Sequence, residues 1–422
     1  MTEQAKLARR LGTFDAVVIG LGSMIGAGVF AAFAPAAGAA GALLLVGLAL
    51  AAGVAYCNAV ASAQLAAQYP TSGGTYVYGR ERLGEWWGFL AGWGFVIGKT
   101  ASCAAMALTF AAYAVPGPRW VERLVAAVAV VTLTGVNLRG ITRTAGLTRI
   151  LVAVSLVALA IVVGVILGSG DASTGNLTWA LPHGPYGVLQ SAGLLFFAFA
   201  GYARIATLGE EVRDPRRTIP RAIPLALGIT VAVYVVVAAS VLLVLGPDRL
   251  ASSVTPLESA VRSVGAGWAV PLVDVGAAVA SLGALLALIA GIGRTTLAMA
   301  REGDLPRWLS SVHPRYRVPD HAELAVAVAV TLLVLITDLR GAIAFSSFGV
   351  LTYYAIANAS AWTQRGEWRR WPRALNAIGL VGCVMLVATL PVTAVVAGLA
   401  MFAIGLAWRV VIRRRAALSL PA

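Results

Sequence analysis

Long apolar segments recur along the whole 422-residue chain, and they limit the folds that are open to it. A bilayer contains about 30 Å of hydrocarbon, so a helix that crosses it needs about 20 apolar residues. Twelve such segments can be read from the sequence: residues 14–33, 40–66, 86–114, 121–138, 146–168, 188–209, 222–246, 267–298, 322–338, 341–362, 374–391 and 393–412. The loops between them are short. We therefore predict an all-α polytopic membrane protein with twelve transmembrane helices and no separate soluble domain.

Composition and charge agree with a membrane protein and indicate its orientation. Hydrophobic residues make up 59% of the chain and charged residues 12%, whereas soluble domains are about half apolar and a quarter charged. The net charge is +14, and most basic residues lie in every second loop. The positive-inside rule places those loops in the cytoplasm, together with the N-terminal residues 1–13 and the basic tail 413–422. Since the charge is spread over many loops, it does not indicate nucleic-acid binding, and we expect a multi-pass protein of the cytoplasmic (inner) membrane.

Two of the apolar segments contain glycine at mid-membrane depth, where it weakens a helix by about 1 kcal/mol relative to alanine. The first holds "GSMIGAGVF", residues 22–30, and the sixth holds Gly201 within "FFAFAGYAR". A helix break frees backbone groups that lipid cannot satisfy, so it must line a cavity or bind a ligand. The N-terminus of the half-helix after a break favours a carboxylate. Close packing through small residues is the alternative, because Gly22 and Gly26 are four residues apart.

The positions of the two glycine-containing segments indicate an internal repeat. Paired interruptions at matching places in two halves are a sequence sign of a transporter site. The first and sixth segments are five apart, and an odd number of helices per unit inverts the second unit. Residues 14–168 and 188–362 are therefore predicted to be two inverted five-helix repeats, with residues 374–412 as two additional helices. The halves share no visible sequence identity, so this prediction depends on spacing, and it favours a binding site over packing alone.

Four segments resemble one family of membrane proteins. They are "IGLGSMIGAGVF", "FFAFAGYARIATLGEEVRDPRRTIPRAI", "GRTTLAMAREGDLPRWLSSVHPRYRVP" and "FSSFGVLTYYAIANASAW". Together they resemble the amino acid–polyamine–organocation (APC) superfamily, and in particular its bacterial amino acid permeases. The resemblance implies a five-plus-five inverted repeat of the sodium–amino acid symporter type, with discontinuous first and sixth helices. It also implies alternating access around a site at the midplane of the membrane.

The resemblance also implies substrate-binding residues. In relatives, the carboxylate of the amino acid binds amides of the broken first helix, and its amino group binds carbonyls of both breaks. The matching positions are Gly22, Ser23, Ile25, Gly26, Ala27 and Gly28 in the first helix and Phe199, Ala200 and Gly201 in the sixth. Phe197 matches an aromatic lid over the substrate. Simpler alternatives stay open, because membrane phenylalanines commonly face lipid or core and Ser23 can bond to its own helix backbone.

The chain departs from some relatives at two places. Relatives such as the arginine/agmatine antiporter carry a Glu just after the break in helix 6, where this chain has Ala203. That difference argues against recognition of a cationic side chain by this carboxylate and favours small neutral substrates, or cations recognised elsewhere. Several sodium-independent relatives carry a Lys in helix 5, whereas the matching place here is near Ser155 and has no Lys.

A lysine in the third segment, Lys99, lies about 20 Å from the start of that segment, near its middle. A charge at that depth is costly and usually has a partner inside the protein. Three roles are open: a proton-coupling site, a fixed cation that replaces a sodium ion, or a structural donor to carbonyls near the breaks. Arg204 follows the sixth-helix break as a candidate gating residue, and Asp274 in the eighth segment is a candidate partner for either cation.

These observations predict secondary active amino acid transport, most simply proton-coupled uptake, with an amino acid, protons and the lipid bilayer as partners. An amino acid exchanger and a polyamine or organic amine permease are the alternatives within transport. A non-transporting sensor is a further alternative. An enzyme is not expected, because no His lies in an apolar segment and no catalytic motif or phosphate-binding loop is present. Cys57, Cys103 and Cys383 lie in separate segments, so neither a metal nor another cofactor is expected. The sequence defines no oligomeric state.

Overall fold

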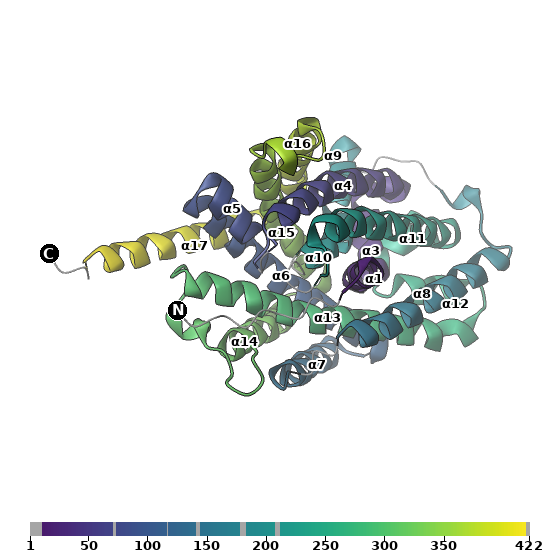
Figure 1. The fold of residues 1–422 in the computed structure, drawn as a ribbon. Coiled ribbons are helices and arrows are strands. Elements are labelled where there is room, and N and C mark those ends of the chain that lie inside the picture. Colours follow the sequence, from purple (N-terminus) through teal and green to yellow (C-terminus); the bar gives the residue numbers. More distant parts are fainter. Residues whose placement is uncertain are drawn as a thin grey trace.

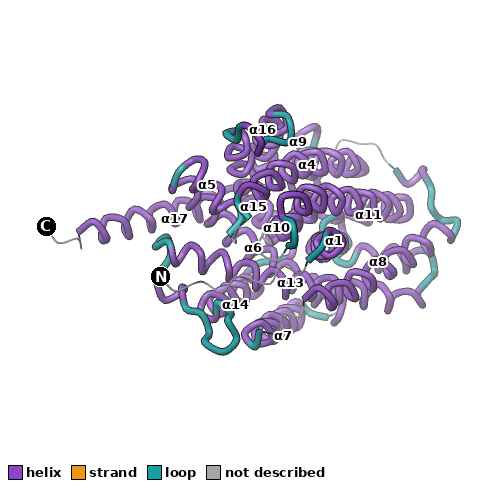
Figure 2. Tube along the Cα trace, in the orientation of Figure 1, coloured by secondary structure: helices purple, strands orange, loops and turns teal. Residues whose placement is uncertain are grey.

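The structure is a computed structural model that describes residues 11–70, 73–115, 117–140, 144–177, 183–206 and 212–418, with backbone only at 144, 145, 203 and 414–418. Within these ranges the chain is helical and has no strand beyond one isolated bridge between Leu11 and Val212 (Figure 2). The predicted all-α class is confirmed. Of the two segments predicted to be cytoplasmic termini, residues 1–10 and 419–422 lie outside the described residues.

The described helices follow one another along the chain with few long connections (Figure 1). They are α1 (Thr13–Met24), α2 (Ala27–Ala31), α3 (Phe33–Ala40), α4 (Leu44–Gln68), α5 (Thr75–Leu83), α6 (Glu85–Ala114), α7 (Arg119–Leu138), α8 (Thr144–Gly168), α9 (Gly184–Phe199), α10 (Ala203–Ala206), α11 (Pro215–Ser252), α12 (Pro256–Ser263), α13 (Val270–Arg301), α14 (Asp320–Ile336), α15 (Leu339–Trp362), α16 (Arg373–Thr389) and α17 (Val392–Leu418).

Ten helical segments in the described residues are long and apolar enough to cross a membrane. They are Thr13–Ala31, Phe33–Gln68, Glu85–Ala114, Arg119–Leu138, Gly146–Gly168, Gly184–Ala206, Pro215–Ser252, Gly267–Arg301, Leu339–Trp362 and Val392–Arg413. The protein is therefore a multi-pass membrane protein. The two other predicted segments, 322–338 and 374–391, coincide with α14 and α16, which have 17 residues each. The count of twelve stays a prediction.

The boundary between the first two predicted segments differs from the structure. The first was expected to end at residue 33, but helical structure continues through α3 to Ala40. Gly41 then has φ 59° and ψ −138°, a conformation that glycine adopts far more readily than other residues, and α4 begins at Leu44. Since the residues on both sides of Gly41 are apolar, hydropathy alone does not reveal this turn.

Two short helices, α5 and α12, lie outside the predicted segments. Helix α5 is bounded by Gly74 with φ 55° and Gly84 with φ 102°, so glycines in left-handed conformations separate it from α4 and α6. It packs against α6 and α15 and carries Tyr76 and Arg80.

Helix α6 lies at the centre of the bundle and packs most extensively against α15 and α13. In its most apolar stretch 89% of the residues are buried, against 17% in α17, which extends away from the bundle (Figure 1). Helix α1 packs against α11, α8 and α13, and it also contacts the turn that follows α9. The interior of the molecule thus brings the first, third, sixth and eighth predicted segments together.

Candidate functional site

The first membrane helix is interrupted where its glycines predict. Helix α1 ends at Met24, and Ile25 has φ −78° and ψ 73°. Gly26 has φ −125° and ψ −144°, and α2 begins at Ala27. All of these residues are buried. The interruption therefore exposes backbone groups inside the protein, and the N-terminus of α2 lies directly after it.

The sixth membrane helix is interrupted as well. Helix α9 ends at Phe199, and Ala200, Gly201 and Tyr202 form a tighter 3₁₀ turn before α10 begins at Ala203. A change from α to 3₁₀ hydrogen bonding alters which carbonyls are paired. Ala200 and Gly201 are both buried, so their carbonyls depend on protein groups or a ligand for partners.

The two interruptions touch through glycine. A Cβ atom on Gly201 would lie 2.2 Å from the carbonyl oxygen of Ser23, and a Cβ on Gly28 would lie 2.5 Å from the Cβ of Ala198. Gly22 and Gly26 instead face different helices, since Gly22 meets Val152 of α8 and Gly26 meets Ala284 of α13. Close packing and helix interruption therefore occur together, and only glycine permits the contact at 201.

A tyrosine joins the two interruptions. The buried hydroxyl of Tyr234, on α11, lies 2.5 Å from the carbonyl oxygen of Met24 and 3.0 Å from that of Ala198. It donates its proton to these oxygens at the ends of α1 and α9. Its ring lies 5.1 Å from that of Phe199. Sequence reasoning missed Tyr234, because it is one aromatic residue within a long apolar segment and its partners are backbone atoms.

Lys99 reaches the interruption in helix 6. Its side chain is 4% exposed, and its Nζ donates to the carbonyl oxygen of Ala200 at 2.8 Å. The hydroxyl of Tyr354, on α15, lies 3.4 Å from the same oxygen. Of the three roles that the sequence leaves open for Lys99, this contact fits that of a structural donor to a carbonyl near a helix break. Ser23 donates to Ile19 of its own helix at 2.9 Å, which was the simpler alternative for that residue.

A pocket opens beside Lys99. It brings together four of the predicted site residues, Lys99, Ala200, Gly201 and Arg204. The remaining lining residues are Gly73, Phe95 and, on α13, Ala287, Leu288, Gly291, Arg294 and Thr295. The α13 residues at 287, 288, 291, 294 and 295 follow helical spacing and present one face to the pocket. Sequence reasoning did not assign these α13 residues to the site, although Arg294 is a rare cation within an apolar segment.

The sequence of residues 11–411 matches the model of the amino acid permease family. The chain belongs to the amino acid permease family.

Curated relatives agree with this assignment. An uncharacterized transporter of Mycobacterium tuberculosis is 61% identical, over 97% of this chain and 93% of the relative. The branched-chain amino acid permease BcaP of Bacillus subtilis is 26% identical, over 89% of this chain and 85% of its own length. Cationic amino acid transporter 4, a vacuolar protein of Arabidopsis thaliana, is 29% identical, over 82% of this chain and 61% of its own length. These proteins are transporters, so the permease is a transporter and not an enzyme.

Several predicted site residues of the permease lie away from the pocket. Asp274 is 13 residues before Ala287 on α13, which is about 20 Å along the helix. The structure therefore does not bring Asp274 to Lys99, and within the described residues its Oδ1 is buried without a hydrogen-bond partner. Phe197 and Phe199 are buried and do not line this pocket. The side chain of Ala203 lies outside the described part of the chain.

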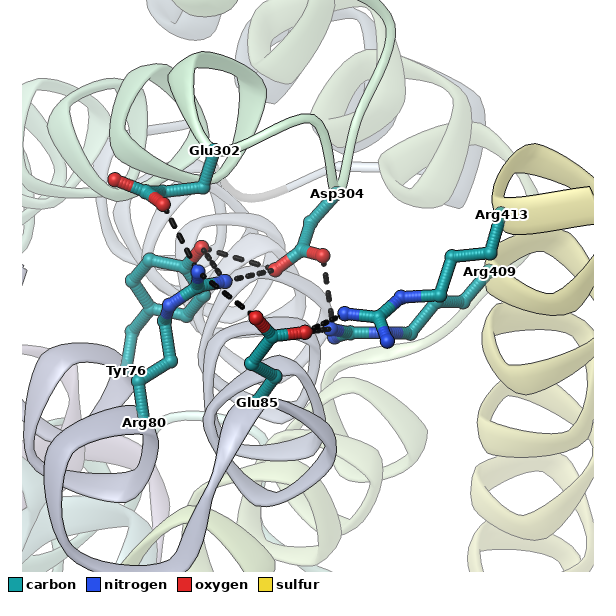
Figure 3. A network of polar contacts seen from close by, with 7 residues as sticks. All are labelled: Tyr76, Arg80, Glu85, Glu302, Asp304, Arg409 and Arg413. Carbon is teal, nitrogen blue, oxygen red and sulfur yellow. Dashed lines mark hydrogen bonds and ion pairs between the residues drawn. The ribbon is translucent and has the colours of Figure 1, made fainter. Parts of the chain in front are cut away.

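A second polar cluster surrounds Asp304, three residues after the end of α13 (Figure 3). We call it the Asp304 network; it comprises Tyr76, Arg80, Glu85, Glu302, Asp304, Arg409 and Arg413. Asp304 is 4% exposed and accepts a hydrogen bond from Tyr76 at 2.9 Å. It forms ion pairs with Arg80 at 3.6 Å and with Arg409 at 3.2 Å.

The Asp304 network joins four parts of the permease. Arg80 on α5 also pairs with Glu302 at the end of α13 at 3.0 Å, and Glu85 begins α6 and pairs with Arg413 of α17. Arg409 is 1% exposed, and its guanidinium lies 4.7 Å from the centre of the Phe89 ring. Burial raises the pKa of Asp304, and the positive charge of Arg409 opposes that rise. Sequence reasoning missed this network, although "REGDLPRW" was part of the family resemblance.

Proposed function

We propose that this permease is a secondary active transporter that takes up amino acids across the cytoplasmic membrane by alternating access. The observation that carries the proposal is the crossing of two interrupted helices at Gly201 and Ser23, beside a pocket. Buried backbone groups at such a crossing need partners that change when a substrate binds or leaves. The family and the names of its relatives support amino acids as the substrate class.

The substrate backbone is proposed to bind at the two interruptions. The amides from Ser23 to Gly28 would receive its carboxylate, because the N-terminus of a half-helix carries unpaired donors and a partial positive charge. The carbonyls of Gly22, Ser23, Phe199, Ala200 and Gly201 would receive its ammonium group. Support for this placement comes from the burial of both interruptions and from their contact in the structure.

Lys99 is proposed to couple transport to protons. It donates to the carbonyl oxygen of Ala200, so its protonation state is linked to the backbone of helix 6. A buried lysine changes its protonation more readily than arginine, which suits a proton carrier. Arg204 lines the same pocket and is proposed to gate it. Asp274 is proposed to act apart from these residues, because it lies about 20 Å further along α13.

We also propose the remaining predicted architecture, which is consistent with alternating access. Over its described residues, each of the twelve predicted segments coincides with helical structure, which supports twelve membrane crossings. The interruptions occur in the first and sixth of these segments, which supports inverted repeats at residues 14–168 and 188–362, followed by helices 11 and 12 at residues 374–412. With both termini cytoplasmic, the Asp304 network lies on the cytoplasmic side.

Uptake into proteoliposomes tests the proposal. The purified permease is reconstituted and offered radiolabelled amino acids under an inward proton gradient, an inward sodium gradient, or with unlabelled amino acid inside. The variants are Lys99→Ala and, as a matched control, Lys6→Ala, which removes the other lysine of the chain. We expect proton-driven uptake that Lys99→Ala abolishes and Lys6→Ala preserves.

The other outcomes discriminate between mechanisms. Uptake that requires internal amino acid would identify an exchanger, with Lys99 as a fixed structural charge. Uptake driven by sodium and unaffected by Lys99→Ala would remove the coupling role. No flux of any amino acid, in protein whose folding is verified by circular dichroism and a cooperative thermal transition, would contradict amino acid transport.

A further inference from the structure

A buried glutamate packs against the helix that lines the pocket. Glu323, in the first turn of α14, is 2% exposed. Its side chain lies against the backbone of α13 at Gly293, because a Cβ atom on Gly293 would be 2.7 Å from its Cγ and 3.7 Å from its Cδ. The glycine at position 293 leaves the space that this side chain occupies. The chain therefore holds a carboxyl group inside the bundle, next to the pocket residue Arg294.

One oxygen of this carboxyl group has no partner. Oε2 of Glu323 is buried and accepts no hydrogen bond within the described residues. A charge buried in a protein is costly unless it is paired and hydrogen-bonded. A carboxylate can only accept hydrogen bonds, whereas a protonated carboxyl group is neutral and also donates one. Binding of a proton is therefore a change that this group can undergo without a metal or a cofactor.

Among the described residues, two charged groups act on Glu323: Arg294 of α13 and, more weakly, Asp320 of its own helix. Helices α6 and α7 and the 3₁₀ turn Arg307–Ser310 also pack against α14. None of their described charged groups is among those that act on Glu323. His321, on the same helix, is exposed and lies 2.8 Å from a carbonyl oxygen of that turn instead. Arg294 is thus the residue that responds most to the charge of Glu323.

Arg294 connects Glu323 to the pocket, because it lines the pocket and also interacts with Glu323. Protonation removes the negative charge of Glu323 and with it the attraction between the two side chains. Proton binding therefore changes the electrostatic balance at a residue of the pocket wall. This link does not require Arg294 to be free of other contacts, since it depends only on the change in charge at Glu323.

We propose that Glu323 binds a proton that is transported with the amino acid, and that Arg294 links this proton to the substrate pocket. The inference rests on the proposed function, because it takes uptake to be driven by protons, and it adds a second proton-binding residue to Lys99. An O–H bond forms when Glu323 takes up the proton and breaks when the same proton is released to the cytoplasm. Gly293 lies about 12 Å along α13 from the end of that helix at Arg301, so the distance to the cytoplasmic end is short.

Glu323→Gln separates proton coupling from substrate binding, because it keeps the size of the side chain and removes its titration. Proteoliposomes are offered a radiolabelled mixture of the standard amino acids, either under an inward proton gradient or with the unlabelled mixture inside and no gradient. We expect Glu323→Gln to reduce proton-driven uptake to below about a tenth of the wild-type level and to keep at least about half of the exchange. Glu81→Gln, at an exposed position of α5, is the matched control and should equal the wild type in both assays.

The pH dependence of the apparent affinity gives a readout that a structural role would not move. Proton and substrate bind cooperatively in a symporter, so the affinity falls as the pH rises and the proton is lost. In the wild type, the half-saturating concentration of the mixture should rise at least about fivefold between about pH 5 and about pH 8. In Glu323→Gln that change should fall below about twofold, because the amide stays neutral.

The outcomes separate this inference from the proposed function. Proton-driven uptake or a pH dependence at the wild-type level in Glu323→Gln would overturn the inference and leave amino acid transport standing. Loss of exchange as well, in folded protein, would also overturn it, because Glu323 would then be a structural residue. If Glu323→Gln does not fold, Glu323→Asp replaces it: the retained carboxyl group should shift the pH of half-maximal uptake, and an unshifted profile would contradict the inference. No uptake by the wild type, or uptake driven by sodium alone, would contradict the proposed function and this inference with it.

Discussion

Gly201 lies against the backbone of Ser23, so closely that a Cβ atom on Gly201 would be 2.2 Å from the Ser23 carbonyl oxygen. Real Cβ atoms do not approach a carbonyl oxygen to that distance, and backbone atoms cannot rotate away as a flexible side chain can. The crossing of the two interrupted helices therefore depends on the absence of a side chain at position 201.

Gly201→Ala should separate the two interrupted helices. We expect overpacking to destabilise the protein by about 1–3 kcal/mol and to reduce amino acid uptake to near background, because the crossing forms the proposed substrate site. Gly228→Ala is the matched control, since no atom lies within 4 Å of a Cβ at that position of α11. Thermal unfolding in detergent and uptake into proteoliposomes measure the two effects. Wild-type uptake by Gly201→Ala would show that the crossing is not needed for transport.

Tyr234→Phe should weaken the same crossing, because Tyr234 on α11 bonds to both interrupted helices. The substitution removes the hydroxyl that donates to the carbonyls of Met24 and Ala198 and leaves these buried oxygens without that partner. We expect a loss of about 1–3 kcal/mol in unfolding free energy and reduced uptake. Tyr186→Phe, at an exposed tyrosine of α9, is the control and should change stability by less than about 0.5 kcal/mol. Equal stability of the two variants would contradict a bridging role for Tyr234.

The helices of this permease could be predicted because hydropathy reports burial in lipid directly. Each predicted apolar segment coincides with helical structure over its described residues. Hydropathy does not report backbone conformation, so the turn at Gly41 and the separate helix α5 were missed. At Gly41 the deciding feature is a glycine with positive φ between apolar residues, whereas α5 is a polar segment with a glycine of positive φ at each end.

The site was predictable only where a residue type is rare in its surroundings. Lys99 and Gly201 could be singled out because a charge or a helix-weakening residue in a membrane segment needs a reason. Tyr234 could not, since its partners are carbonyls 210 and 36 residues away in the sequence. In the sequence Arg409 is one of several arginines near the end of the last apolar segment, and only the folded chain places it against Asp304.

Two arginines of α17 should differ sharply in their importance for stability. Arg409 is 1% exposed and pairs with Asp304, whereas the side chain of Arg413 is 44% exposed and pairs with Glu85. Removing Arg409 leaves the buried Asp304 with Arg80 as its remaining ion-pair partner, so Arg409→Gln should cost up to about 3–5 kcal/mol. Arg413→Gln should cost at most about 1 kcal/mol, because exposed pairs are screened by water. Thermal unfolding of both variants in detergent compares them, and equal losses would show that the Asp304 network does not hold α17 through Arg409.

The carboxyl group of Asp304 should make stability depend on pH. Burial raises its pKa above the ordinary value of 3.8, although Arg409, the hydrogen bond from Tyr76 and Arg80 oppose the rise. A raised pKa in the folded state means that folding favours the protonated form. The resulting stabilisation is fully present below pH 3.8 and is lost as the pH rises through the raised pKa.

Asp304→Asn removes that titration, so the stability difference between wild type and variant should change with pH. We expect the wild type to lose stability relative to Asp304→Asn as the pH rises from 3.8, and the difference to become constant above the raised pKa. Unfolding midpoints in detergent across this range measure the difference. Asp171→Asn, at an exposed position after α8, controls for the loss of a carboxyl group and should follow the wild-type profile. If the wild type instead gains stability relative to Asp304→Asn over the same pH range, the prediction is contradicted. Arg409 and Arg80 would then stabilise the charged form of Asp304.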